Sequence, residues 1–307
     1  MKATVQTLEA APDLLKAPTT EKSLAAVLGE LFKLRLTTLV LLTTLVGFYL
    51  GSRPPVSWVL MVNALLGTGL LASGASALNQ LLERKHDAKM RRTQDRPLPS
   101  GRLTPESVLI IGSVCGMGGL VYLALTVNLL TALLGAITFG SYVLIYTPLK
   151  RVTTLNTVIG AIPGALPPLM GWTAARGAMS TEGWSLFAIL CFWQLPHFLA
   201  IAWMYREEYA KAGFVMLPVV DPSGERTGRQ AFSHTLGLLP ISLCPFLFKM
   251  VGGVYLVGAL LLGAAFLWSA FQFSRHLTLQ RARLLFFASI IYLPALLGLM
   301  VFDKIPN

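Results

Sequence analysis

Charged residues are scarce in this chain. Asp, Glu, Lys and Arg make up 13% of its 307 residues, about half the share of an average soluble domain. Cysteine is scarcer still, with three residues, which excludes a disulfide-stabilised scaffold. Disorder is excluded because 54% of the residues are hydrophobic. The composition therefore indicates an integral membrane protein.

Long apolar runs support this class, since about 20 helical residues cross the hydrocarbon core of a bilayer. Proline and glycine within the runs predict kinks and close helix approaches, which membrane helices tolerate. We expect an all-α integral membrane protein with about nine transmembrane helices, in which a polar cytoplasmic tail (1–30) precedes a transmembrane domain (31–307). The nine candidate spans are 34–52, 57–79, 106–126, 129–147, 155–175, 184–205, 232–250, 253–273 and 284–302.

The net charge of +11 is distributed unevenly over these spans. With the N-terminus inside, 21 of the 25 Lys and Arg residues fall on the inner side, which predicts an N-in, C-out orientation. The first 24 residues contain acids but no arginine, so they resemble neither a signal peptide nor a transit peptide. The lipid bilayer is the expected partner, and no nucleic acid is expected. The four outer basic residues are Arg53, Arg176, Lys249 and Lys304.

Acidic residues gather in two of the inner segments. Orientation accounts for basic residues but not for acids, so carboxylates that share a segment with cations indicate a site. Eight of the 14 acids lie there, at Glu83, Asp87, Asp95, Glu106, Glu207, Glu208, Asp221 and Glu225.

The first segment follows the second span. Asn79, Glu83 and Asp87 are spaced i, i+4, i+8, which places three oxygen-bearing side chains on one helix face. Oxygen ligands suit Mg²⁺, which is usually held by one or two carboxylates and by substrate phosphates. Arg92 and Arg96 follow, and their guanidinium groups match phosphate geometry. The alternative is a solvated helix end with paired charges.

The second segment follows the sixth span and repeats this design with Arg206, Glu207 and Glu208. Two acidic clusters that meet at one membrane face could bind two metal ions bridging a diphosphate. The alternative is an ordinary interfacial charge pair. Within the span itself, His197 is either a functional ionisable group or a structural histidine bonded to a neighbouring helix.

The motifs of both segments resemble a known family. Asn79-x-x-x-Glu83-x-x-x-Asp87-x-x-Met90-x-Arg92-Thr93-x-x-Arg96-Pro97-Leu98 looks like the first signature of the UbiA superfamily of intramembrane prenyltransferases, in the form of its protohaem IX farnesyltransferase (haem O synthase) branch. Further similar stretches are Tyr146-Thr147-x-Leu149-Lys150-Arg151-x-Thr153, Asn156, Gly164-x-x-Pro167-Pro168-x-x-Gly171-Trp172, Trp193-Gln194-x-Pro196-His197-Phe198 and Tyr205-Arg206-Glu207-x-Tyr209.

The resemblance covers most of residues 30–300, with two departures. Glu83 stands where many members have aspartate, which keeps the carboxylate. The second aspartate-rich motif is reduced to Arg206, Glu207 and Glu208. This reduction looks characteristic of the haem branch and favours it over prenylation of quinone precursors.

The resemblance implies an enzyme that transfers the farnesyl group of farnesyl diphosphate to a vinyl group of haem B, giving haem O and diphosphate. By the same resemblance, Asn79, Glu83 and Asp87 would place Mg²⁺, with Glu207 or Glu208 supporting a second ion. The groups expected to neutralise diphosphate or bind substrate are Arg92, Arg96, Lys150, Arg151, Arg206 and Tyr146, and His197 is expected to orient haem.

Such an enzyme is expected in the bacterial cytoplasmic (inner) membrane, with its active site on the cytoplasmic side. Haem A synthase or oxidase assembly factors are the protein partners that this role would involve. A prenyltransferase acting on a quinone precursor or another aromatic acceptor is the alternative. A transporter is a second alternative. A transporter would place its polar residues near the middle of the membrane, often on broken helices.

Overall fold

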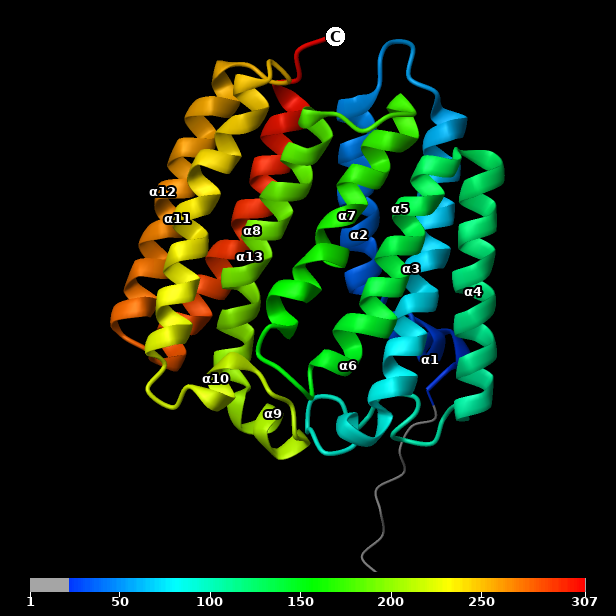
Figure 1. Cartoon of the computed structure of the whole chain (residues 1–307), viewed down its shortest axis with the longest axis vertical. Helices are drawn as coiled ribbons and strands as arrows, with labels where there is room; N and C mark the ends of the chain where they lie inside the picture. Colours follow the sequence, from blue (N-terminus) through cyan, green and yellow to red (C-terminus); the bar gives the residue numbers. More distant parts are fainter. Residues whose placement is uncertain (1–21, 307) are drawn as a thin grey trace, which may run out of the picture.

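The computed structural model describes residues 22–306, and helices are the regular elements of this range. Nine long helical segments run side by side in a bundle (Figure 1). They are α2 (Leu34–Gly51), α3 (Trp58–Asp87), α4 (Pro105–Thr126), α5 (Leu129–Gly140) with its continuation η1 (Ser141–Tyr146) and α6 (Thr147–Leu149), α7 (Asn156–Arg176), α8 (Thr181–Met204), α11 (Glu225–Leu247), α12 (Gly253–Arg275) and α13 (Leu279–Phe302).

Three short helices lie at one end of the bundle, which we call the α9 end (Figure 1, bottom). They are α1 (Leu24–Leu31), α9 (Arg206–Ala212) and α10 (Leu217–Val220). The connections 88–104 and 205–224 lie at the same end, whereas the chain finishes at the opposite end. The two segments rich in acids are therefore at one end, as the alternation of spans predicts.

The expected class is confirmed: the chain is an all-α integral membrane protein. Each predicted span corresponds to one long helical segment, and eight of these segments in the described part of the chain are long and apolar enough to cross a membrane. The remaining one is α11, whose first turns carry Glu225, Arg226 and Arg229. The ninth crossing and the N-in, C-out orientation stay predictions.

Close helix packing in the bundle depends on small residues, as the sequence predicts. A side chain at Gly47 would clash with the backbone of Pro168, and one at Gly171 with the backbone of Thr44, so α2 and α7 need both glycines to approach this closely. Small residues serve this purpose in lipid, where burial of apolar surface does not drive helices together. Lipid-facing positions such as Leu125 and Phe302 are accordingly apolar and exposed.

The structure departs from the predicted boundaries in three places. α3 continues eight residues past the predicted span to Asp87, because the residues that follow the apolar run are polar but continue the helix. The fourth span contains the π-helical turn η1, a wider turn of the kind found at functional sites. Residues 1–21 of the predicted tail lie outside the described residues, but α1 packs on α3, where the Gln80 side chain donates to the carbonyls of Glu30 and Leu31.

Candidate active site

The last turns of α3 carry Asn79, Glu83 and Asp87, which we call the α3 row. Their exposed fractions are 0%, 5% and 1%, and the continuous helix places them on one face, as their spacing predicts. Ionisable groups are almost never this deeply buried unless they are paired. The burial excludes a solvated helix end.

Each member of the row contacts a cation from outside α3. These three residues, the row cations, come from different connections, so tertiary folding and not helical spacing brings them together. The contacts are Lys33 Nζ donating to Asn79 Oδ1 at 2.6 Å, Lys150 Nζ with Glu83 Oε1 at 2.8 Å, and Arg96 Nη1 with Asp87 Oδ2 at 2.7 Å.

Local backbone features place the row cations. Lys33 has a positive φ of 49°, which ends α1 and redirects the chain into α2. Lys150 directly follows η1 and α6, where Thr147 Oγ1 accepts a hydrogen bond of 3.0 Å from Asn79 Nδ2. The loop that carries Arg96 is tied to α3 by Thr93, whose hydroxyl donates to the Asp87 carbonyl.

The row cations differ in their protonation. Burial lowers the pKa of Lys33 to about 7, with Arg96 adding repulsion. Burial also acts to lower the pKa of Lys150, but the adjacent Glu83 carboxylate outweighs it, and the net shift is upward. Lys150 is thus a permanent cation at neutral pH. An anion bound between the row cations would favour protonated Lys33.

One buried oxygen of the row has neither a hydrogen-bond donor nor an ion-pair partner within residues 22–306. Asp87 Oδ1 is buried and accepts no hydrogen bond within residues 22–306, although an unsatisfied buried carboxylate oxygen is costly. Together with the oxygens of Asn79 and Glu83, it makes a donor set of the kind that Mg²⁺ prefers. The residues therefore fit a hard divalent cation.

The second segment contacts the first one. Arg92 donates its backbone N–H to Glu208 Oε2 at 3.3 Å and its guanidinium to Tyr209 Oη at 3.2 Å. The guanidinium also lies over the Tyr205 ring, 5.2 Å from its centre. From α3, His86 Nδ1 lies 2.7 Å from the Ala212 carbonyl. The two segments are thus in contact, as the sequence predicts.

This contact does not assemble a second cluster of acids. Glu207 is exposed, and residues 22–306 contain no group of three or more His, Cys, Asp or Glu side chains able to hold a metal. The second ion at Glu207 or Glu208 therefore stays a prediction.

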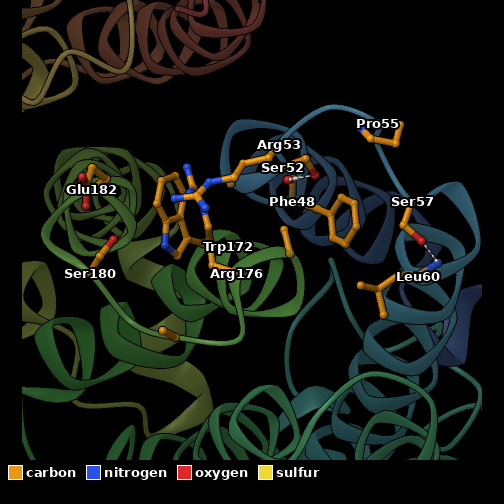
Figure 2. Close-up of a pocket in the computed structure, with 13 residues that line it drawn as sticks. Phe48, Ser52, Arg53, Pro55, Ser57, Leu60, Trp172, Arg176, Ser180 and Glu182 are labelled. Atoms are coloured by element: carbon orange, nitrogen blue, oxygen red, sulfur yellow. Dashed lines mark hydrogen bonds between the residues drawn. The ribbon is translucent and has the colours of Figure 1, made fainter. Parts of the chain in front are cut away.

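Two hollows lie at opposite ends of the bundle. The larger, about 480 Å³, is at the end of the bundle away from α9. There, Trp172 and Arg176 of α7 lie between α2 and the start of α8 (Figure 2). The smaller, about 350 Å³, is at the α9 end, and we call it the α8–α13 cavity. Its lining residues are Arg92, Ile201, Met204, Tyr205, Arg283, Phe286 and Phe287.

A family model for the UbiA prenyltransferase family matches residues 40–291. The chain belongs to the UbiA prenyltransferase family. Among curated relatives, it is 48% identical over 284 residues to the protoheme IX farnesyltransferase of Solibacter usitatus, covering 90% of this chain and 97% of that one. It is 46% identical over 277 residues to the protein of that name from Opitutus terrae, covering 90% and 94%.

Solved structures of other UbiA-type proteins share the fold. One described as digeranylgeranylglyceryl phosphate synthase in membranes has a TM-score of 0.77 at 15% identity and covers 91% of this chain and 98% of its own. A UbiA homologue from Archaeoglobus fulgidus bound to GPP and Mg²⁺ has a TM-score of 0.62 at 16% identity, with coverages of 89% and 99%. These structures show that the chain has the UbiA fold, and its family and curated relatives show that it is a prenyltransferase.

Other predicted site residues lie in this UbiA bundle at varying distances from the α3 row. Tyr146 contacts Lys150, whose amine lies 4.5 Å from the centre of its ring. Arg151 turns to His86, with 3.5 Å between Nη1 and Nε2. Arg206 folds back on Trp203, at 4.5 Å from its ring and 3.1 Å from its carbonyl oxygen. Tyr146 thus adjoins the row, whereas Arg206 faces the end of α8.

The surroundings of His197 are those of a structural histidine bonded to a neighbouring helix, the second of the two interpretations of this residue. Its Nδ1 lies 2.7 Å from Ser289 Oγ, which links α8 to α13. Its ring is stacked between Trp193 and Phe286, at centroid distances of 5.1 and 5.0 Å. A direct role toward haem stays a prediction.

Sequence reasoning missed two residues of the site. Lys33 counted only as an orientation charge, and Thr147 lay within an apolar span. The position of Lys33 directly before the first apolar run could have indicated its role. It places Lys33 at the same membrane face as the polar end of the second span. Thr147, 1% exposed, offered no such signal, because its contact with Asn79 depends on how η1 packs.

Proposed function

We propose that this chain transfers the farnesyl group of farnesyl diphosphate to a vinyl group of haem B and so makes haem O. The observation that carries the proposal is the α3 row, a buried set of oxygens surrounded by cations at one membrane end. The names of the relatives at 46–48% identity supply the farnesyl donor and the haem acceptor.

Asn79, Glu83 and Asp87 would hold Mg²⁺, and the unpartnered Asp87 Oδ1 supports this assignment. When bound, the ion would neutralise phosphate oxygens and so make diphosphate a better leaving group. Glu207 or Glu208 would support a second ion.

The chain's own residues would stabilise the diphosphate as it departs. Lys33, Lys150 and Arg96 contact the row from three different segments of the chain, so their charges are already positioned when negative charge develops on the leaving oxygen. Arg96 adds a planar fork that matches a phosphate. Arg151 lies one residue beyond Lys150 and would add positive charge at the edge of the site.

The transfer replaces one bond by another. The allylic C–O bond of farnesyl diphosphate breaks, and its electron pair leaves with the diphosphate. The π electrons of the haem vinyl group form the new C–C bond to the allylic carbon. Water then adds to the resulting cation and loses a proton, which leaves the hydroxyl group of haem O. The apolar helices accommodate the farnesyl chain and keep water from the allylic cation.

The α9 end would face the cytoplasm of a bacterium, with the chain in the inner membrane. The predicted excess of basic residues at this end supports that orientation. Haem A synthase or oxidase assembly factors would then receive the product, and haem B would reach the enzyme from the same side or from the bilayer.

A product assay tests the function. Membranes containing the chain, from cells without their own haem O synthase, are incubated with labelled farnesyl diphosphate and either haem B or 4-hydroxybenzoate. Mass spectrometry should detect haem O in the first arm and no prenylated product in the second. Label transferred only to 4-hydroxybenzoate would replace this proposal with a quinone-type prenyltransferase.

A further inference from the structure

The α8–α13 cavity lies at the α9 end, beside the loop that carries the row cation Arg96. Its volume of about 350 Å³ falls in the range of small-molecule sites, about 300–1,000 Å³. Its walls come from the end of α8, the first turns of α13 and Arg92 of the 88–104 loop. It therefore lies where the proposed diphosphate site adjoins the outside of the bundle.

Two arginines line this cavity. Arg92 and Arg283 come from segments about 190 residues apart, and neither side chain forms an ion pair with a carboxylate within residues 22–306. Glu208 contacts Arg92 only through the backbone N–H. Two guanidinium groups without acid partners can bind a ligand that carries carboxylates.

The rest of the lining is apolar and aromatic. Ile201, Met204, Phe286 and Phe287 form most of it, with the ring of Tyr205 beside Arg92. Phe286 is stacked on His197 behind it. A surface of this kind suits a flat, apolar ring system with a few charged groups at one edge.

We propose that the α8–α13 cavity is the acceptor subsite, in which Arg92 and Arg283 bind the two propionate carboxylates of haem B. This inference rests on the proposed function, because it takes haem B as the acceptor. Haem B carries both propionates on one edge of its ring and its vinyl groups elsewhere on the periphery. Propionates held at the arginines leave the vinyl groups free to face the bundle.

The 88–104 loop connects this subsite to the proposed diphosphate site. It contributes Arg92 to the cavity and Arg96 to Asp87, with only three residues between them. The same loop therefore positions acceptor and donor relative to each other. Arg92 in this account binds the acceptor, whereas the sequence prediction assigned it to the phosphates.

The first experiment measures haem binding without turnover. Purified protein in detergent is titrated with haem B and with its dimethyl ester, and the change in the Soret band gives the dissociation constant. Arg283→Gln should weaken binding of haem B about tenfold, the loss of one charge-assisted interaction. Its binding of the dimethyl ester should be unchanged, since the ester lacks carboxylates.

Arg281→Gln is the matched control, because Arg281 lies one half-turn away on α13 and does not line the cavity. It should bind both ligands as the unmodified protein does. Arg283→Lys should recover part of the lost affinity, since it restores the charge but not the fork.

Steady-state kinetics provide a second, separate readout. Arg283→Gln should raise KM for haem B about tenfold, with kcat and KM for farnesyl diphosphate nearly unchanged. Equal binding of haem B and its dimethyl ester by the unmodified protein would overturn the subsite, and this measurement needs no variant. Absence of haem O from the unmodified protein would instead overturn the proposed function.

Discussion

Arg96 at the α9 end and Arg176 at the opposite end lie in different surroundings. At the α9 end, Arg96 contacts a carboxylate that is 1% exposed, and the row is buried beneath three cations. At the opposite end, Arg53 and Arg176 line the larger hollow, and neither forms an ion pair within residues 22–306 (Figure 2). The comparison teaches that buried acids, and not cavity volume, mark the position of the chemistry.

The reason is energetic. Burying a carboxylate costs several kcal/mol unless cations and hydrogen bonds compensate it, so a bundle has little reason to keep three oxygen-bearing groups at membrane depth for stability alone. Arg53 is exposed and Arg176 is half-buried, so positive charge at this edge can reach water at a smaller cost than a buried carboxylate. The larger hollow is therefore compatible with ordinary interfacial anchoring.

The largest expected effect comes from exchanging one acid at each end. Asp87→Asn removes one of the two carboxylate charges of the row and should lower haem O formation by about 100-fold or more, a loss typical of removing a group that stabilises developing charge. Asp303→Asn is the control at the opposite end, where Asp303 Oδ2 accepts the Tyr255 N–H at 2.7 Å. Asparagine can still accept that bond, so activity should be retained.

The measurement is the rate of haem O formation per amount of inserted protein, determined by immunoblot of washed membranes. Similar rates for both variants would show that the two ends do not differ in the way proposed here.

The next effect concerns the stability of the row. Lys150→Met leaves the Glu83 carboxylate buried and deprives it of its 2.8 Å partner, which should cost about 3–5 kcal/mol of unfolding free energy. The double variant Glu83→Gln/Lys150→Met removes both charges and should recover most of that stability without recovering activity. Thermal unfolding in detergent measures the first quantity, and the product assay measures the second.

A double variant as unstable as Lys150→Met would contradict the pairing. A double variant with normal activity would contradict the role of this pair in the reaction.

A third, smaller effect tests the geometry of one contact. Arg96→Lys keeps the charge near Asp87 but replaces a planar fork with a point charge, so KM for farnesyl diphosphate should rise about tenfold. Arg102→Lys is the control in the same loop, since Arg102 contacts Glu30, Asp95 and Ser100, none of which belongs to the α3 row. Equal KM values for these two variants would mean that Arg96 supplies charge without specific geometry.

Much of this architecture could be predicted from sequence. In a membrane protein, an apolar run of about 20 residues indicates a helix that crosses the bilayer. Each of the nine runs corresponds to a long helical segment. The α3 row was predictable too, because the period of an α-helix fixes which residues share a face.

The partners of the row were not predictable, since they depend on long-range packing. Lys33, which itself has a left-handed backbone conformation, contacts Asn79, which lies 46 positions later in the sequence. No local sequence pattern encodes that contact. Arg92 was assigned to phosphates together with Arg96, yet its side chain lies over Tyr205 and donates to Tyr209. Spacing alone cannot distinguish two arginines that lie in one irregular loop and point to different sites.

The smallest expected effect belongs to the opposite end. Arg176→Gln removes a charge that lies over the buried Trp172 ring, 5.4 Å from its centre, and a cation–π contact of this kind contributes about 0.5–2 kcal/mol to stability. KM for farnesyl diphosphate, KM for haem B and kcat should all stay within about twofold of the unmodified protein, a difference of about 0.4 kcal/mol. A tenfold rise in either KM would place a substrate in the larger hollow, and the distinction between the two ends would fail, because a cavity at the end away from the α3 row would then bind substrate.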